Sequence, residues 1–257
     1  MNGSPRISSN ACQTCRVRGE SLVCRVAEAD LDAFGRLLHR FEYQPRQVVF
    51  YEGHPCLGIY VLCAGKAKLT TSSSRGHRRI IRLVGPGDLI ECNGFSEGAV
   101  HEVTCETLEP SRLCLINRQG YLDRLEKSPA YAIQLLQLVS QRIMTTTLGR
   151  ERIPFCKTAE RLAALLLHLS RRFGHRSSEG LTLGIHLTRE ELGELIGAAP
   201  ETVIRLISRF KREHLVGSAG DEILLLNPER LSKLATPLPE ESAPRPGTTE
   251  PPVHPRR

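Results

Sequence analysis

The chain has 257 residues, 40% hydrophobic and 25% charged, which is the composition of an ordinary globular protein with one large or two modest domains. No apolar run reaches the roughly 18 residues of a membrane span, and the polar N-terminus lacks the apolar stretch of a secretion signal, so we expect a cytoplasmic protein without a membrane partner. The net charge of +7 suits a polyanionic partner. No nucleophile–base pair or phosphate-binding glycine loop is evident, which argues against an enzyme.

Residues 1–25 form an arm without clear periodicity, and it carries Cys12, Cys15 and Cys24 at C-x2-C-x8-C spacing. The chain has nine cysteines, a high number for the cytoplasm, where disulfides are not favoured. Three closely spaced thiols suit a zinc ion or an iron–sulfur cluster, each of which needs a fourth ligand. A reversible disulfide switch and unrelated reduced thiols are the alternatives.

Short apolar segments separated by Gly, Pro, Ser or Asn follow the arm, and they indicate strands. Many short strands at this spacing predict an antiparallel β-barrel or sandwich, which we place over residues 26–127. The predicted strands are Val48–Tyr51, Gly58–Cys63, Ala67–Thr71, Ile80–Val84 and Arg112–Ile116.

A long helix is predicted next, over residues 128–153, with Ser128 as its N-cap and Pro129 as its first residue. Apolar residues alternate at spacings of four and three, which is typical of a coiled-coil seam. This pattern predicts a parallel homodimer, and an ordinary helix packed on the barrel is the alternative. The seam residues are Ala132, Leu136, Val139 and Ile143.

Residues 154–235 are predicted to form a second domain, whose first helix is capped by Thr158, and residues 236–257 a disordered tail. Thr188 and Glu191 make a capping box for a helix over Arg189–Ile196. Gly197 supplies a turn, and a second helix runs from Pro200 to about Glu213. Two short helices joined in this way form a helix-turn-helix, and the following segment to Leu226 is predicted to form a hairpin wing.

The second of these helices has an inward face made by Val203, Leu206, Ile207 and Phe210. Its opposite face points toward a DNA major groove, where arginine binds guanine, glutamate accepts from cytosine and an isoleucine contacts a thymine methyl group. A solvated helix face is the alternative. The predicted DNA-contacting residues are Thr188, Pro200, Glu201, Thr202, Ile204, Arg205, Ser208 and Arg209.

The E-T-V-x-R pattern beginning at Glu201 resembles the recognition helix of the CRP/FNR superfamily, and AERLAALLLHLSRRFG resembles the FNR (fumarate and nitrate reduction) branch. The resemblance covers about residues 12–235. It implies an α+β fold with a cyclic-nucleotide-binding-type antiparallel β-barrel (a double-stranded β-helix or jelly roll), a dimerisation helix and a winged helix-turn-helix. It also implies an activator that recruits RNA polymerase, with Glu201 and Arg205 reading TTGAT-like half-sites of a palindrome. FNR proteins usually carry Ser where Ile204 stands.

The resemblance also bears on the effector. Cyclic-nucleotide binders of the superfamily carry G-E-[LI] and a later R-[ST]-A, whose arginine pairs with the phosphate. This chain has Ile90-Glu91-Cys92 and His101-Glu102-Val103 instead, which argues against cyclic AMP.

FNR-type sensors hold a [4Fe–4S] cluster with an N-terminal cysteine trio and one cysteine on a late barrel strand. The resemblance therefore implies Cys12, Cys15, Cys24 and Cys114 as ligands and a response to oxygen, with Cys105 and then Cys92 as the next choices for the fourth ligand. FNR proteins commonly show the shorter C-x2-C-x5-C spacing. We expect Cys56, Cys63 and Cys156 to be buried small hydrophobes. Structural zinc or a thiol/disulfide switch in place of the cluster remains the alternative.

Overall fold

A computed structural model describes residues 15–19, 21–25, 34–73, 76, 78–91, 93–130, 132–137, 140, 157–178, 180–220 and 222–235. Several predictions about particular residues lie outside this part of the chain and are not addressed by the structure. They concern Cys12, Cys92, Cys156, Val139, Ile143, the end of the long helix at residue 153 and the tail 236–257.

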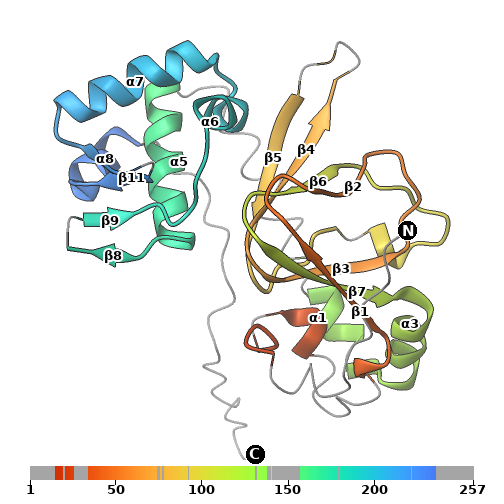
Figure 1. The fold of residues 1–257 in the computed structure, drawn as a ribbon. Coiled ribbons are helices and arrows are strands. Elements are labelled where there is room, and N and C mark those ends of the chain that lie inside the picture. The colour runs from red at the N-terminus through yellow and green to blue at the C-terminus, as the bar shows by residue number, and fades with distance from the viewer. Residues whose placement is uncertain are drawn as a thin grey trace, which may run out of the picture.

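The N-terminal part, here called the sensor domain, consists of two antiparallel sheets (Figure 1). One sheet has the strand order β1-β7-β3, and the other has the order β2-β6-β4-β5. The antiparallel fold class expected from the sequence is confirmed, and the expected strands are present. The strand bounds are β1 Leu38–Tyr43, β2 Val48–Phe50, β3 Gly58–Ala64, β4 Ala67–Ser72, β5 Arg78–Val84, β6 Thr104–Thr107 and β7 Ser111–Asn117.

Two strands of the sensor domain, β1 and β6, were not predicted from the sequence. β1 reads Leu-His-Arg-Phe-Glu-Tyr, and only Leu38 in it is fully buried, so its apolar content is too low to mark a strand. It is held instead by pairing along its whole length with β7. β6 has only four residues. Both strands are therefore defined by their partners more than by their own pattern.

The β1-β7-β3 sheet separates two apolar cores, because alternate side chains of each strand point to opposite faces. Tyr60, Leu62 and Leu113 face the second sheet and pack with Phe50, Leu69 and Cys105. The other face packs against the arm and the helix that follows β7. This outer core contains Val23, Cys24, Phe34, Leu38, Ile59, Val61, Leu89, Cys114, Ile116 and Tyr121.

Helices surround the outer core. α1 (Leu22–Arg25) belongs to the arm, the 3-10 helix η2 (Asn93–Phe95) lies against β3, and α3 (Arg118–Lys127) follows β7 directly. The Asn117 side-chain oxygen caps α3 by accepting a hydrogen bond from the Gly120 amide at 2.9 Å. Ser128 ends α3, and residues 129–130 and 132–137 are again helical, as expected for the start of the long helix.

The C-terminal domain is a helix-turn-helix with a small antiparallel sheet of order β10-β11-β9-β8. Its first helix begins at Thr158, but the N-cap is Lys157 and not Thr158 as predicted, and the Lys157 amide donates to the Glu160 carboxylate at 3.1 Å. The elements are α5 Thr158–Arg172, β8 Arg176–Ser177, β9 Gly180–Thr182, α6 Arg189–Ile196, α7 Pro200–Arg212, β10 Val216–Ala219, β11 Glu222–Leu225 and α8 Pro228–Leu234.

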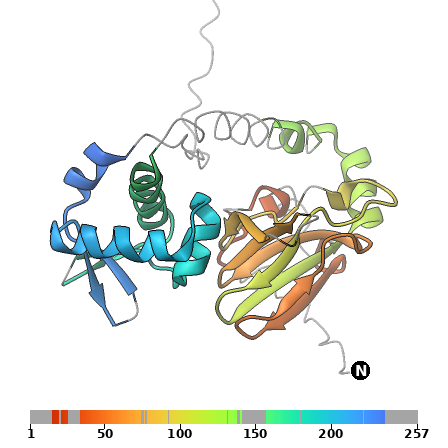
Figure 2. The same ribbon diagram turned by 90° about the horizontal axis from the view of Figure 1, so that it is seen from above.

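The two domains touch along β5 and α6, as Figure 2 shows from above. Ile80 and Leu83 of β5 pack into the apolar core of the C-terminal domain. A second contact lies in the turn that follows β5, where the Arg172 guanidinium forms an ion pair with Asp88. The position of the helix-turn-helix is therefore tied to the sensor domain. Within the described residues, no helix is both long and apolar enough to cross a membrane.

Candidate functional site

The helix-turn-helix is built as its sequence predicts. The Thr188 hydroxyl accepts a hydrogen bond from the Glu191 amide at 3.1 Å, and the Glu191 carboxylate accepts one from the Thr188 amide at 2.8 Å. These reciprocal bonds satisfy two amides that the start of α6 would otherwise leave without partners. Gly197 ends α6 with φ of 65°, in the left-handed region that glycine enters without strain.

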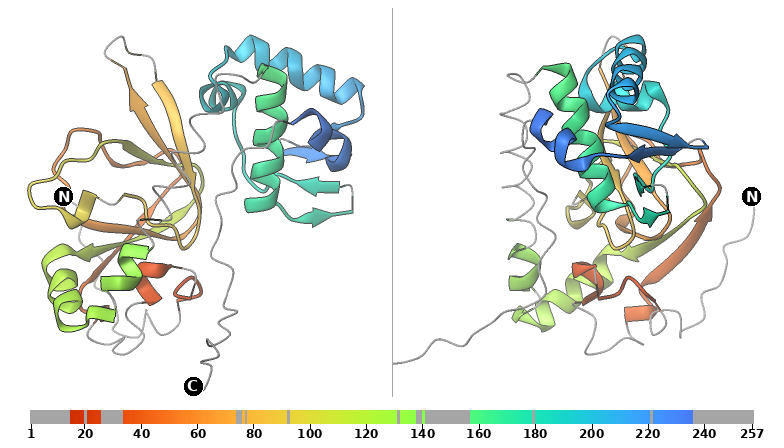
Figure 3. Two further views of the ribbon diagram at one scale, coloured as in Figure 1. Left: turned by 180° about the vertical axis from the view of Figure 1, so that it is seen from behind. Right: turned by 90° about the vertical axis from the view of Figure 1, so that its left-hand side faces the viewer.

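The recognition helix α7 presents one apolar and one exposed face. Val203, Ile207 and Phe210 are buried and Leu206 is half-buried, as predicted from the helical period. The residues expected to contact DNA lie as follows: Glu201, Ile204, Arg205, Ser208 and Arg209 are exposed, and Pro200 and Thr202 are half-buried near the start of the helix. α7 lies at one end of the C-terminal domain, and β8 and β9 lie at the other end (Figures 1 and 3).

Two features of the exposed face bear on base reading. Ile204 remains 51% exposed, which has no packing explanation within the chain and leaves its methyl groups available to a partner. Arg209 is paired with Glu213 at 2.8 Å, whereas the guanidinium of Arg205 has no ion-pair or hydrogen-bond partner among the described residues. Arg205 is thus the better placed of the two arginines for a guanine contact.

Glu191 also joins α6 to the sensor domain. Its carboxylate accepts from the Lys68 ammonium of β4 at 2.7 Å and from Arg46 at 2.5 Å, and Lys68 contacts Glu106 at 2.9 Å as well. Burial by itself raises the pKa of Glu191, but the hydrogen bonds from Lys68, the Thr188 amide and Arg46 outweigh it and lower the pKa to about 2. The carboxylate therefore stays ionised and holds the first helix of the helix-turn-helix against β4.

The sensor domain contains a second candidate site. It is a pocket lined by four cysteines, between the arm and the outer face of the β1-β7-β3 sheet. Its cavity volume is about 10 Å³, which is room for about one water molecule. Cys15 and Cys24 come from the arm, Cys63 from β3 and Cys114 from β7. The full lining is Cys15, Arg18, Cys24, Phe34, Leu38, Arg40, Cys63 and Cys114.

Strand register explains why two of these thiols meet. Val61 pairs with Cys114 across β3 and β7, and Cys63 follows on the same face two residues later. The register shifts between Leu62 and Ala64, so Cys63 lies at a β-bulge, a feature that re-aims a side chain. The Cys63 Sγ lies 2.8 Å from the Cys114 Sγ. This exceeds the roughly 2.05 Å of a disulfide, and no described cysteine is in one.

The Cys63 thiol is hydrogen-bonded to two other thiols of the pocket, those of Cys114 and Cys15. Cys63 acts as donor: its hydrogen bonds to Cys114 and Cys15, together with burial, raise the pKa of its thiol. The acceptors shift the other way. The hydrogen bond from Cys63 is the main cause that lowers the pKa of Cys15 to about 5, and it also lowers the pKa of Cys114, with Arg40 adding to both effects. The pocket thus favours the thiolate form of Cys15 and Cys114, which is the form that binds metals.

Three of the four predicted metal ligands can be placed, and the structure brings Cys15, Cys24 and Cys114 together. The expectation for Cys63 was wrong: it is not an isolated buried hydrophobe but a half-buried thiol in contact with Cys114. The alternation of side chains along a strand could have placed Cys63 on the same face as Val61. It could not have identified Cys114 as the residue on the neighbouring strand. Cys105, our second choice, is fully buried on β6 in the core between the sheets, so the β1-β7-β3 sheet separates it from the pocket.

The positions that would hold a cyclic nucleotide in relatives bind each other here. The Glu91 carboxylate is hydrogen-bonded to the buried His101 ring, and it accepts a second hydrogen bond from the Glu102 amide at 3.1 Å. No arginine stands at either position.

Residues 40–128 match the cyclic nucleotide-binding domain family, and residues 160–234 match the Crp-like helix-turn-helix domain family. The fumarate and nitrate reduction regulatory protein of Vibrio cholerae is 28% identical over 230 residues, covering 87% of this chain and 90% of that protein. The CRP-like cAMP-activated global transcriptional regulator of Mycobacterium tuberculosis is 26% identical over 211 residues, covering 82% and 94%.

Solved structures agree on the fold. FixK2 from Bradyrhizobium japonicum superimposes with a TM-score of 0.66 at 22% identity, covering 77% of this chain and 98% of that one. TTHB099 from Thermus thermophilus, a regulator of the CRP family, gives a TM-score of 0.65 at 18% identity, covering 79% and 100%. The matched relatives are regulators and not enzymes, and the two matched domains together span more than half of the chain. The chain therefore belongs to the CRP/FNR family of DNA-binding transcription regulators.

Proposed function

We propose that this regulator acts in the cytoplasm as a homodimer and reads a palindrome of TTGAT-like half-sites, whose centres lie about one helical turn apart. The reading is carried by the exposed face of α7, where Glu201, Ile204 and Arg205 point away from the domain core. As an activator it would recruit RNA polymerase, as the family resemblance implies. Dimer symmetry matches the symmetry of such a site.

The proposed dimer contact is the helix that begins at Pro129. Ile133 and Leu136 are 57% and 66% exposed, although both are large apolar side chains on a regular helix. Leu135, by contrast, packs against the outer core of the sensor domain. One side of the helix is therefore used within the chain, and the side of Leu136 is left for a second copy.

The proposed effector site is the four-cysteine pocket, and the proposed cofactor is a [4Fe–4S] cluster held by Cys12, Cys15, Cys24 and Cys114. The observation that carries this proposal is the convergence of two arm thiols and one rigid strand thiol on a single pocket beside Arg18 and Arg40. Guanidinium groups there balance the negative charge of thiolate ligands. A cluster bound in this pocket would supply sensitivity to oxygen and redox conditions.

In a second possible ligand set, Cys63 would take the place of Cys12. Its thiol lies against Cys114 and lines the same pocket. We assign it instead as the hydrogen-bond donor to the Cys114 sulfur, because that is the contact it makes. Structural zinc, or a disulfide switch among these thiols, is the alternative to the cluster.

Signal transfer would follow the chain. β7 carries Cys114, and α3 begins immediately after β7 at Arg118. The helix with Leu136 starts directly after α3, and Leu135 on it packs against the outer core that contains Cys24 and Cys114. A change in how the arm cysteines are held would therefore reach the proposed dimer contact through packed side chains.

The nature of the cofactor is tested on protein purified without oxygen. We expect it to be coloured and to contain iron and acid-labile sulfide in equal molar amounts, both lost on exposure to air. Stoichiometric zinc without sulfide would replace the cluster by a structural zinc site. Colourless, metal-free protein with air-dependent disulfides would favour the thiol switch. Neither result would affect the DNA-binding assignment.

Base reading is tested by Arg205→Ala. We expect loss of discrimination at one G·C pair of each half-site, worth about 1–3 kcal/mol, because a bidentate guanine contact disappears. Competition binding against operators substituted at each position measures this. Arg79→Ala, which removes an exposed arginine of β5, serves as the charge-matched control and should leave discrimination unchanged. A uniform loss on all sequences would mean that Arg205 contacts only phosphate.

A further inference from the structure

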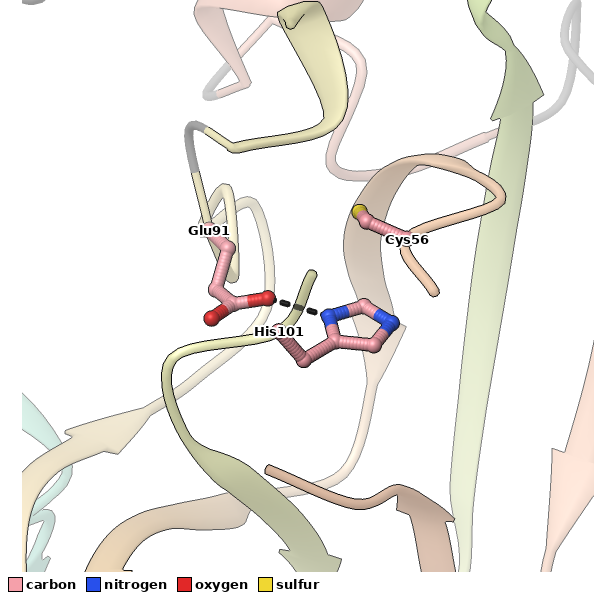
Figure 4. Close-up of side chains that lie close together, drawn as sticks. All are labelled: Cys56, Glu91 and His101. Atoms are coloured by element: carbon pink, nitrogen blue, oxygen red, sulfur yellow. Dashed lines mark hydrogen bonds and ion pairs between the residues drawn. The ribbon is translucent and has the colours of Figure 1, made fainter. Parts of the chain in front are cut away.

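A second group of metal-binding side chains lies in the sensor domain. The thiol of Cys56, the carboxylate of Glu91 and the ring of His101 each offer a ligand atom, and these atoms lie within 4.8 Å of one another (Figure 4). The three residues come from separate segments, before β3, after β5 and before β6. His101 is 2% exposed and Cys56 is 9% exposed, so this is an interior cluster and not a chance grouping on the surface.

The segments that carry the cluster are held together by stacking and by backbone hydrogen bonds. The His101 ring stacks on Phe50 with ring centroids 3.6 Å apart and planes 6° from parallel. Backbone hydrogen bonds link the loops that carry the ligands, from the Cys56 amide to Ala99 and from the His101 amide to His54, each at 2.8 Å. A site whose backbone segments are already held together loses less conformational entropy when it binds an ion.

The chemistry of the three donors indicates a specific class of ion. Sulfur, imidazole nitrogen and carboxylate oxygen together suit zinc or a similar divalent transition metal, not magnesium or calcium. Bonds of about 2.0–2.3 Å place tetrahedral ligands roughly 3.3–3.8 Å apart. The three ligand atoms here lie within 4.8 Å of one another, which is a similar spacing. One thiolate and one carboxylate balance a divalent charge, so the occupied site is neutral, as a buried site requires.

We propose that Cys56, Glu91 and His101 bind a divalent zinc-type ion, with a fourth position open to water or an exchangeable ligand. On binding, the Cys56 thiol loses its proton to solvent, and the hydrogen bond between the His101 ring and the Glu91 carboxylate is replaced by bonds from both groups to the ion. The ion would then join the loop before β3 to both ends of the connection between β5 and β6. This site is independent of the cysteine pocket, which lies on the other face of the β1-β7-β3 sheet.

Cobalt titration of the full-length chain tests the site, because thiolate-bound Co²⁺ gives a charge-transfer absorption. The titration uses a background in which Cys15, Cys24, Cys63 and Cys114 are all replaced by serine, which removes the four thiols of the cysteine pocket. We expect one ion per chain with thiolate absorption that Zn²⁺ displaces. Cys56→Ser should abolish the absorption, and Glu91→Gln should weaken binding about 10–100-fold. Cys105→Ser, which removes a fully buried thiol elsewhere in the domain, should change neither.

A measurement on the unsubstituted chain guards against variants that fail to fold. Alkylation of each cysteine is followed by peptide mass mapping, with Zn²⁺ or with a chelator. We expect Zn²⁺ to slow modification of Cys56 and the chelator to restore it. Equal rates for Cys56 under both conditions, or thiolate absorption that survives Cys56→Ser, would overturn the proposal. Either result would leave the iron and sulfide measurement on the cysteine pocket unaffected. The two proposals are therefore tested independently.

Discussion

Cys114→Ala is expected to abolish the visible absorption of protein purified without oxygen and, with it, tight operator binding. Cys114 is the thiol on a rigid strand, and it lies between the arm cysteines and the start of α3. Without it, the arm thiols lose their anchor on the β1-β7-β3 sheet, and the link from the pocket to the dimer contact is broken. Absorption spectra, iron and sulfide content, and operator binding of the same anaerobic sample measure the effect.

Two matched variants show whether the loss is specific to the pocket. Cys105→Ala removes an equally buried thiol from the core between the sheets and should retain colour and operator binding. Cys63→Ala should also retain colour, because Cys63 is assigned as a hydrogen-bond donor to Cys114 and not as a ligand. Loss of colour in Cys63→Ala would exchange Cys63 for Cys12 in the ligand set. Loss in Cys105→Ala alone would contradict the pocket as the site.

Leu136→Glu is expected to give monomers in sedimentation and to weaken operator binding by about 10²–10⁴-fold. The side chain is 66% exposed in the single chain, so a charge there costs the monomer little. In the proposed dimer it would bury an unpaired carboxylate in an apolar seam, which is strongly unfavourable. The binding loss follows because two joined half-site readers gain affinity from their effective concentration.

Gln137→Glu is the matched control, since it adds the same charge at the next position of the same helix, where the side chain is already exposed and polar. It should remain dimeric and bind the operator normally. A dimeric Leu136→Glu protein would place the interface on another surface. The helix content of both variants, measured by circular dichroism, should match that of the unsubstituted chain, because neither change touches a contact buried within a single chain.

The helix-turn-helix could be predicted from sequence because its determinants are local. The capping box of Thr188 and Glu191, the left-handed Gly197 and the period of Val203, Ile207 and Phe210 all act within a few residues. Such features depend on backbone geometry that a short segment carries with it. The α6 and α7 starts therefore agree with the expected residues, and the outward position of Arg205 follows from the same period.

Other features depend on which segments pair, and no local pattern contains that information. The pairing of Val61 with Cys114 and the bulge at Cys63 bring two thiols together that are separated by 50 residues of intervening chain, which turned an expected core hydrophobe into part of the cysteine pocket. The contact of Glu191 with Lys68 joins two domains in the same way. So does the meeting of Cys56, Glu91 and His101.

Sequence alone thus determined the class of the protein, because helix caps, turn residues and apolar periods are set by neighbours along the chain. Only the tertiary structure decided which thiols share a pocket, which carboxylate joins the domains and which ligand atoms surround one point. Those decisions rest on strand register and on packing between remote segments, where a shift of one residue would send each side chain to the opposite face of its sheet.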